Sequence, residues 1–372
     1  MIVQHLLTKV HRLFRMSLTT PVTELLGIKH PVMLAGMGRV AGAPLVAAVS
    51  NAGGLGVIGG VGYTEAMLRE MLAEVKANLR DPNLPFGVDL LIPQVGGSAR
   101  KTNYDYTKGS LDKLVDVVIE SGAKLFVSAV GVPPKSIVDK LHNAGILYMN
   151  MIGHPKHVHK ACQVGADIIC AQGGEAGGHT GEVPTSILIP ACADICKQYK
   201  SPLTGQPVQL VAAGGIADGR GLAAALMLGA SAVWIGTRFV TAKESGATKG
   251  AKQDIIDAGF ESTIKSTIWT GRPLRAIKTP YIENWEKNRQ DELQKLQAQG
   301  ILAIDHEMDK FEKEGKIPEE IEDQSVCRPT GVVAALVNKP DQSAAEIVDE
   351  IVSDAKELLE GAHKLVRPLA KL

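Results

Sequence analysis

Residues 167–181 read DIICAQGGEAGGHTG and combine a strand-like run with a glycine-rich loop. The first six residues are mostly apolar and have the composition of a β-strand. Five glycines occupy the next nine positions, and they let the backbone approach a ligand closely because no Cβ stands in the way. A helix-like stretch follows at residues 184–199. The segment therefore predicts one strand, one loop suited to binding, and one helix.

The same strand–loop–helix unit recurs along the chain. The predicted strands are residues 31–37, 54–60, 86–92, 125–130, 146–152, 167–173, 207–215 and 231–239. They are continuous apolar runs, as expected for a parallel sheet that is buried on both faces. Units of this kind in this number predict a (β/α)8 TIM barrel. A doubly wound open sheet is the alternative, but it places its ligand at one switch point, whereas glycine-rich loops follow several strands here.

The chain after the last predicted strand has a different character. Residues 246–343 are richer in charge, lack the strand–helix alternation, and include an amphipathic stretch at residues 281–298. Residues 344–366 carry apolar side chains at helical spacing and are predicted to form the eighth barrel helix. We therefore expect an N-terminal extension (1–16), a barrel (17–245), an inserted helical substrate or lid domain (246–343) and a closing segment (344–372).

Composition limits the possible partners and compartments. The chain has 372 residues, of which 45% are apolar and 22% charged, with 40 basic and 40 acidic side chains. No basic stripe points to nucleic acid, and no apolar run is long enough to span a membrane. The 5 cysteines form no CxxC pair, which fits a reducing compartment. Residues 1–16 resemble a weak mitochondrial presequence. We favour the alternative that they are a functionless extension from an upstream start codon, ahead of a start at Met16, and that the protein is cytoplasmic.

His179 is the candidate catalytic residue of the opening segment. It follows the glycines at the exit of a strand, where an imidazole can be presented to a ligand and can change charge near neutral pH. A solvent-exposed histidine on an ordinary turn is the alternative, and the loop alone does not decide between them. His154, His157 and His159 lie close together in sequence, but a zinc site needs further ligands and no cysteine and histidine cluster stands nearby, so we expect no metal site.

Glycine turns after other strands suggest a cofactor. Residues 212–216 and 234–238 follow the seventh and eighth strands, where barrels commonly hold a phosphate. Residues 35–38 after the first strand offer backbone amides and one flexible side chain, against which a planar ring could lie. On spacing alone, an ordinary turn with no binding role is equally favoured. Residues 54–59 match GxGxxG, but these glycines follow a helix and run through a strand, so they are not a dinucleotide fingerprint.

Four of these motifs together resemble the nitronate monooxygenases, formerly called 2-nitropropane dioxygenases. They are residues 35–37, 171–181, 213–216 and 236–239, and they occur in order at the expected strand ends. The match is to the histidine-containing class in a fungal-length version. It covers residues 20–245 and weakens across residues 246–343.

The resemblance implies non-covalent FMN and a set of site residues. It places the phosphate on Gly214, Gly215, Gly236 and Thr237, the flavin ring near Ala35, Gly36 and Met37, and further cofactor contacts on Gln172, Gly177 and Gly178. His179 matches the catalytic histidine of the family. The chain departs from the family at Asp89, where asparagine is frequent, and at residues 149–151, where many members carry a lysine. Asp89 is nevertheless kept among the expected cofactor contacts.

The implied reaction is oxidation of alkyl nitronates, and possibly of neutral nitroalkanes, with O2 to carbonyl compounds and nitrite. A neutral His179 imidazole would take the α-proton, and an imidazolium would hold the nitronate anion. Arg272 and Arg275 are candidate anion-attracting groups in the inserted domain. The main alternative is an NAD(P)H-dependent FMN reductase acting on quinones or enoyl thioesters. A flavin-free phosphate-sugar enzyme and a catalytically silent flavoprotein are more distant alternatives. A homodimer is possible.

Overall fold

The computed structural model describes residues 18–366, and its centre is a sheet of 8 parallel strands curled into a barrel. The order around the barrel is β1-β9-β8-β6-β5-β4-β3-β2, and a parallel bridge between Met33 and Leu55 joins β1 to the start of β2. The strands are β1 (Val32–Leu34), β2 (Gly56–Gly59), β3 (Phe86–Leu91), β4 (Leu125–Ala129), β5 (Leu147–Ile152), β6 (Ile168–Gln172), β8 (Gln209–Ala213) and β9 (Ala232–Ile235). The predicted (β/α)8 barrel is confirmed.

Both faces of the barrel wall are apolar. Met33, Val127 and Met149 belong to the cluster that fills the barrel interior, together with Trp234 at the eighth strand position. Neighbouring strand residues such as Leu34 and Phe126 pack outward under the helices. This two-sided burial explains why the strands read as continuous apolar runs.

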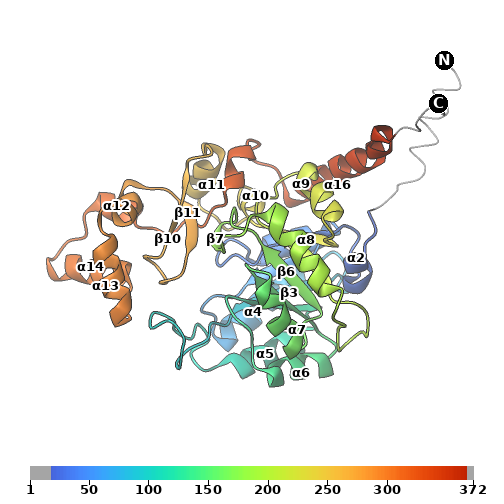
Figure 1. Cartoon of the computed structure of the whole chain (residues 1–372), viewed down its shortest axis with the longest axis horizontal. Helices are drawn as coiled ribbons and strands as arrows, with labels where there is room; N and C mark the ends of the chain where they lie inside the picture. The colour runs from blue at the N-terminus through green and yellow to red at the C-terminus, as the bar shows by residue number, and fades with distance from the viewer. Residues whose placement is uncertain (1–17, 367–372) are drawn as a thin grey trace, which may run out of the picture.

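Helices surround the barrel (Figure 1). They are α2 (Pro21–Leu26), α3 (Ala43–Asn51), α4 (Glu65–Asn78), α5 (Leu111–Ser121), α6 (Lys135–Asn143), α7 (Lys156–Val164), α8 (Thr185–Cys196), α9 (Gly219–Met227) and α16 (Ala344–Gly361), which continues into η2 (Ala362–Leu365). Helix α16 starts at a capping box between Ser343 and Glu346 and packs against α9 and α3. It therefore takes the place of the eighth barrel helix, as the sequence predicted.

The chain between β9 and α16 has its own elements. They are α10 (Thr237–Val240), α11 (Lys249–Ile256), β10 (Thr263–Ser266), β11 (Leu274–Ile277), α12 (Pro280–Asn288), α13 (Gln290–Gln299), α14 (Ala303–Lys313), α15 (Glu319–Gln324) and η1 (Val332–Leu336). Helices α12–α14 have a separate apolar cluster around Trp285 and Ile268 and project away from the barrel helices (Figure 1). The segment is not purely helical, because β10 and β11 form a sheet with β7 (Gly178–His179).

The amphipathic stretch predicted at residues 281–298 is two helices, not one. Helix α12 ends and α13 begins at Arg289, whose backbone is not helical (φ −123°, ψ 24°). The Arg289 guanidinium lies 3.4 Å from the centre of the Trp285 ring and donates to Glu292 and Glu307. These contacts join α12, α13 and α14 across the break. The spacing of apolar residues in the sequence does not reveal that the helix is interrupted.

The GxGxxG match has the place in the fold that the sequence predicted. The glycines of residues 54–59 follow α3 and run into β2, so the GxGxxG match opens no helix. A Cβ on Gly56 would lie 2.0 Å from the Val46 carbonyl oxygen, so this glycine allows α3 to pack on β2. Within residues 18–366 no helix is long and apolar enough to cross a membrane. The same residues contain no group of three or more histidine, cysteine, aspartate or glutamate side chains that could hold a metal ion. The possible presequence at residues 1–16 lies outside the described residues.

Candidate active site

The predicted site residues gather at one end of the barrel. They lie at the carboxyl ends of β1, β3, β6, β8 and β9 or in the loops that follow, where barrel enzymes place their active sites. A Cβ built on Gly236 would lie 3.4 Å from Met37 Sδ and 3.5 Å from Ala35 Cβ. A Cβ on Gly36 would meet the Asp89 side chain at 2.5 Å. The ends of β9, β1 and β3 are therefore in direct contact.

His179 is held by its backbone from two sides. It lies in the short strand β7, where it pairs with Leu274 of β11, while Gly178 pairs with Arg275. On the other side, the Gln172 side-chain amide donates to the His179 carbonyl oxygen at 2.5 Å. The histidine therefore sits on a strand shared between the barrel loop and the inserted segment. Sequence reasoning placed it on a free glycine loop.

The imidazole of His179 is neutral near pH 7. Its Nε2 lies 3.0 Å from Thr270 Oγ1. Burial, and then the charge of Arg272, lower the pKa of His179 to about 4. This lowered pKa favours the neutral imidazole over the imidazolium that was expected to hold the substrate anion. A neutral imidazole remains available as a proton acceptor, and the positive charge beside it belongs to Arg272.

Two guanidinium groups without carboxylate partners lie close together, and the charge of one of them, Arg272, acts on His179. Among residues 18–366 neither Arg272 nor Arg100 forms an ion pair with an acidic side chain. Arg272 Nε donates to Asn103 Oδ1 at 3.1 Å, and an Arg100 amino group donates to the Gly271 carbonyl oxygen at 2.7 Å. Burial and the neighbouring Arg100 charge lower the pKa of Arg272. Arg100 comes from the β3–α5 loop, so two distant segments build this cationic cluster. Sequence reasoning found Arg272 but missed Arg100.

Arg275, the second predicted anion-attracting group, is engaged with the protein. One of its amino groups donates to the Gly174 carbonyl oxygen at 3.0 Å, and the other donates to Thr263 Oγ1 at 3.3 Å. It ties the glycine loop to β10. This arrangement favours a structural role for Arg275 over contact with a substrate.

The inserted segment also covers the glycine loop. A Cβ on Gly177 would lie 2.7 Å from Gly331 N, so the close approach that requires glycine here is to protein backbone. The Gly331 amide donates to Thr237 Oγ1 at 3.0 Å, and the Val332 amide donates to the Glu175 carbonyl oxygen at 3.0 Å. Residues 330–332 thus cover the side of the loop that carries Gly177. They also engage the hydroxyl of Thr237.

The turn after β8 fits a phosphate. Gly214 and Gly215 have left-handed backbone conformations, with φ of 89° and 72°. In the described part of the chain their amides donate to no protein acceptor, while Thr185 Oγ1 donates to the Gly214 carbonyl oxygen at 2.9 Å. Consecutive amides in such a turn form a concave surface that binds anions. The backbone of Gly214 and Gly215 is therefore suited to the phosphate that these residues are expected to bind.

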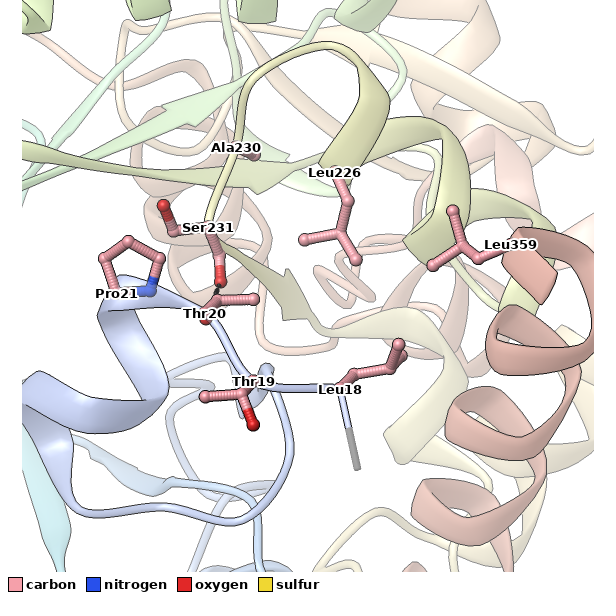
Figure 2. Close-up of a pocket in the computed structure, with 8 residues that line it drawn as sticks. All are labelled: Leu18, Thr19, Thr20, Pro21, Leu226, Ala230, Ser231 and Leu359. Carbon is pink, nitrogen blue, oxygen red and sulfur yellow. Dashed lines mark hydrogen bonds between the residues drawn. The ribbon is translucent and has the colours of Figure 1, made fainter. Parts of the chain in front are cut away.

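Two surface hollows lie elsewhere. One, of about 400 Å³, is lined by residues near the start of α2 and the turn before β9, where Thr20 Oγ1 donates to the Ser231 carbonyl oxygen at 2.6 Å (Figure 2). That turn precedes the strand, so this hollow is at the opposite end of the barrel. The second, of about 830 Å³, lies between the start of α9 and α16. No predicted site residue lines either hollow, although the second hollow begins at Ala217, soon after the glycine turn that follows β8. The residues at the strand ends therefore define the candidate site.

Within residues 18–366, the fold places a glycine turn with unpaired amides and a histidine with a lowered pKa at the mouth of a (β/α)8 barrel. The sequence profile of the nitronate monooxygenase family matches residues 19–366, and the chain belongs to that family. It is thus an oxidoreductase, and membership of this family supports a flavin cofactor.

Individual relatives carry two kinds of name. An octahydro-1H-indene-4-carboxyl-CoA dehydrogenase of Mycobacterium tuberculosis is 36% identical over 298 residues, which are 80% of this chain and 75% of that protein. A probable nitronate monooxygenase of Staphylococcus saprophyticus is 33% identical over 302 residues, or 72% of this chain and 81% of the relative. The structure of FabK from Thermotoga maritima superposes with a TM-score of 0.73 at 28% identity, covering 94% of this chain and 99% of that one.

Proposed function

We propose that this protein binds FMN without a covalent bond and oxidises alkyl nitronates with O2 to carbonyl compounds and nitrite. One observation carries the proposal: a neutral His179 imidazole lies beside the unpaired positive charge of Arg272 at the barrel mouth. FMN, when bound, supplies the redox and O2 chemistry. Gly214, Gly215, Gly236 and the backbone amide of Thr237, whose hydroxyl is engaged by Gly331, would hold its phosphate. Ala35, Gly36 and Met37 would lie against its ring.

The charges at the site favour an anionic substrate. A nitronate is an anion, and Arg272 lacks a carboxylate partner within the described residues. An ion pair between them would satisfy a half-buried guanidinium, which is costly to leave without a counter-charge. The Arg100 charge adds to the same field. We therefore assign substrate attraction and orientation to Arg272.

His179 has a different part in the reaction. A neutral nitroalkane must lose its α-proton before oxidation, and the neutral imidazole can accept that proton. Because the pKa of His179 is lowered to about 4, it is a weak base in the free enzyme. A preformed nitronate needs no such transfer. We therefore propose that nitronates are the better substrates and that neutral nitroalkanes react slowly.

A second candidate function is supported by one of the relatives. The dehydrogenase of Mycobacterium tuberculosis, at 36% identity, is named for an acyl-CoA substrate. That name supports a thioester substrate, which is shared with the alternative of an NAD(P)H-dependent FMN reductase acting on enoyl thioesters or quinones. The same cationic cluster would then face an anionic group of the thioester or of the nicotinamide cofactor.

Paired neutral and anionic substrates test the proposed function. Oxygen consumption and nitrite release are measured with 2-nitropropane and with its nitronate, for the wild type and for His179→Asn. The variant should keep its flavin and lose turnover of the neutral compound by about 10²–10⁴-fold, the usual scale for removal of a general base. Turnover of the nitronate should fall much less. Equal losses would leave His179 as a binding residue only, and no nitrite from either compound would exclude the proposed reaction.

A further inference from the structure

Asp89 is a buried carboxyl group without a partner. It lies on β3, and its side chain is only 2% exposed. Its Oδ1 has no hydrogen-bond partner in the described part of the chain. Burying a polar group without a hydrogen bond is costly, and native proteins rarely leave such a group unsatisfied. An orphaned carboxyl oxygen at this depth therefore needs a ligand or a proton to account for it.

No cation near Asp89 stabilises a carboxylate. Within residues 18–366 it forms no ion pair, and burial alone raises its pKa well above the usual range. The titratable group that it influences is the Cys170 thiol of β6, which is itself buried and has a raised pKa. Burial therefore favours the protonated, uncharged form of each group. A neutral carboxylic acid has an O–H that must find an acceptor, and the described residues provide none.

The position of Asp89 points to the cofactor. A Cβ on Gly36 would fall 2.5 Å from Asp89 Oδ2 and 2.6 Å from Asp89 Cβ, so glycine at 36 leaves the space that the carboxyl occupies. Gly59, at the end of β2, is equally close to the backbone of residues 37 and 38. The turn after β1 thus lies over the ends of β2 and β3, with Asp89 directly against it. The same turn is the surface on which we expect the flavin ring.

We propose that Asp89 is kept as a neutral carboxylic acid that donates its proton in a hydrogen bond to an acceptor atom of the bound flavin. This inference rests on the proposed function, because it takes the flavin as the ligand. Protonated Asp89 is then a positioning residue for the cofactor. Ionisation would abolish the donor and place a buried negative charge beside the ring. Flavin affinity should therefore fall when the pH rises through the titration of this group.

Two substitutions separate the donor from the side-chain volume. Asp89→Asn keeps a hydrogen-bond donor of nearly the same shape and cannot ionise. Asp89→Leu keeps a similar size and removes the donor. Release of FMN on dilution of each holoenzyme is followed by the recovery of flavin fluorescence between about pH 5 and pH 10. The asparagine variant shares every other titrating group, including those of FMN, so it serves as the matched control.

The expected result is a pH-dependent loss of FMN in the wild type that is absent in Asp89→Asn. At the low end of the range the wild type and Asp89→Asn should bind FMN equally. Asp89→Leu should bind FMN about tenfold more weakly than Asp89→Asn at every pH, the effect of one lost hydrogen bond. Identical pH profiles for the wild type and Asp89→Asn would overturn the inference even if the leucine variant fails to fold. Absence of any bound FMN in the wild type would overturn the proposed function as well.

Discussion

Nε2 of His179 lies 3.0 Å from Oγ1 of Thr270, and this contact joins the barrel loop to the inserted segment. His179 is on β7, and Thr270 is in the turn that precedes β11, so the two residues are 91 positions apart. The strand pairing of β7 with β11 brings them together. The candidate base is thus oriented by the segment that also contributes Arg272.

Removing the Thr270 hydroxyl should disturb the orientation of the imidazole. We expect Thr270→Val to lower kcat/KM for a neutral nitroalkane by about threefold to tenfold, the range of one ordinary hydrogen bond, with unchanged flavin content. Thr267→Val is the control, because Thr267 in the same turn accepts from Gln297 and not from His179. If both variants lose activity equally, the Thr270 contact has no specific effect on His179.

The protonation of His179 predicts an acid limb in the pH profile. Reaction of a neutral nitroalkane needs the neutral imidazole, so kcat/KM should be constant at neutral pH and fall as the pH approaches about 4, the pKa of His179 in the folded protein. Arg272→Gln removes one of the two causes that lower this pKa. The acid limb of that variant should therefore lie at higher pH. An acid limb that does not move would show that Arg272 has no electrostatic effect on the histidine.

The same group links stability to pH. In the unfolded chain the histidine has a pKa near 6.5, and in the folded protein near 4. Between these values the unfolded state binds more protons, so the free energy of unfolding should decrease as the pH falls through this window. His179→Asn should reduce the slope, as measured by urea denaturation at a series of pH values. An unchanged slope would mean that His179 titrates normally in the folded protein.

The cationic cluster should govern substrate affinity rather than cofactor binding. Arg272→Ala should raise KM for a nitronate by about 10-fold to 100-fold, the scale of a lost charge-assisted hydrogen bond, with flavin content unchanged. Arg220→Ala is the control, since Arg220 is exposed on α9 and pairs with Asp218. A KM that is unaffected in Arg272→Ala would remove this residue from the substrate site.

Val130 is strained at the barrel mouth. It follows β4 and has a left-handed backbone with φ of 69°, which is unfavourable for a β-branched residue. The next residue, Gly131, passes so close to the exit of β3 that a Cβ there would lie 2.1 Å from the Ile92 carbonyl oxygen. We expect Val130→Gly to be more stable than Val130→Ala by about 1 kcal/mol, because only glycine relieves the strain. Thermal unfolding measures the difference, and a more stable alanine variant would contradict it.

The barrel could be predicted from the sequence because its signals are local. Each strand is a continuous apolar run, and the chain after residue 343 has the capping residue and apolar spacing of a helix. The sheet of β7, β10 and β11 could not be predicted in this way. Strand β7 is the two residues Gly178 and His179 at the end of a glycine-rich stretch, and its partner begins at Leu274. Such pairing depends on the tertiary approach of two segments and leaves no periodic pattern.

The candidate site shows the same division. Motifs at the strand ends predicted that Gly36, Gly215 and His179 lie at the same end of the barrel, because parallel strands finish at one end of a barrel. The pKa of His179 is lowered by burial and by Arg272, and the pKa of Arg272 is lowered by burial and by Arg100, a residue from the β3–α5 loop. Neither burial nor that loop's position follows from residue type, and these are the properties that set the charge of the site.

We propose that a nitronate, and not a nicotinamide cofactor, delivers electrons to the bound flavin. Anaerobic mixing of the holoenzyme with 2-nitropropane nitronate, followed by the visible absorbance of the flavin, tests it most directly. We predict rapid bleaching by the nitronate and no comparable bleaching by NADH or NADPH. Rapid bleaching by a reduced nicotinamide, with an unchanged spectrum after addition of the nitronate, would contradict the account.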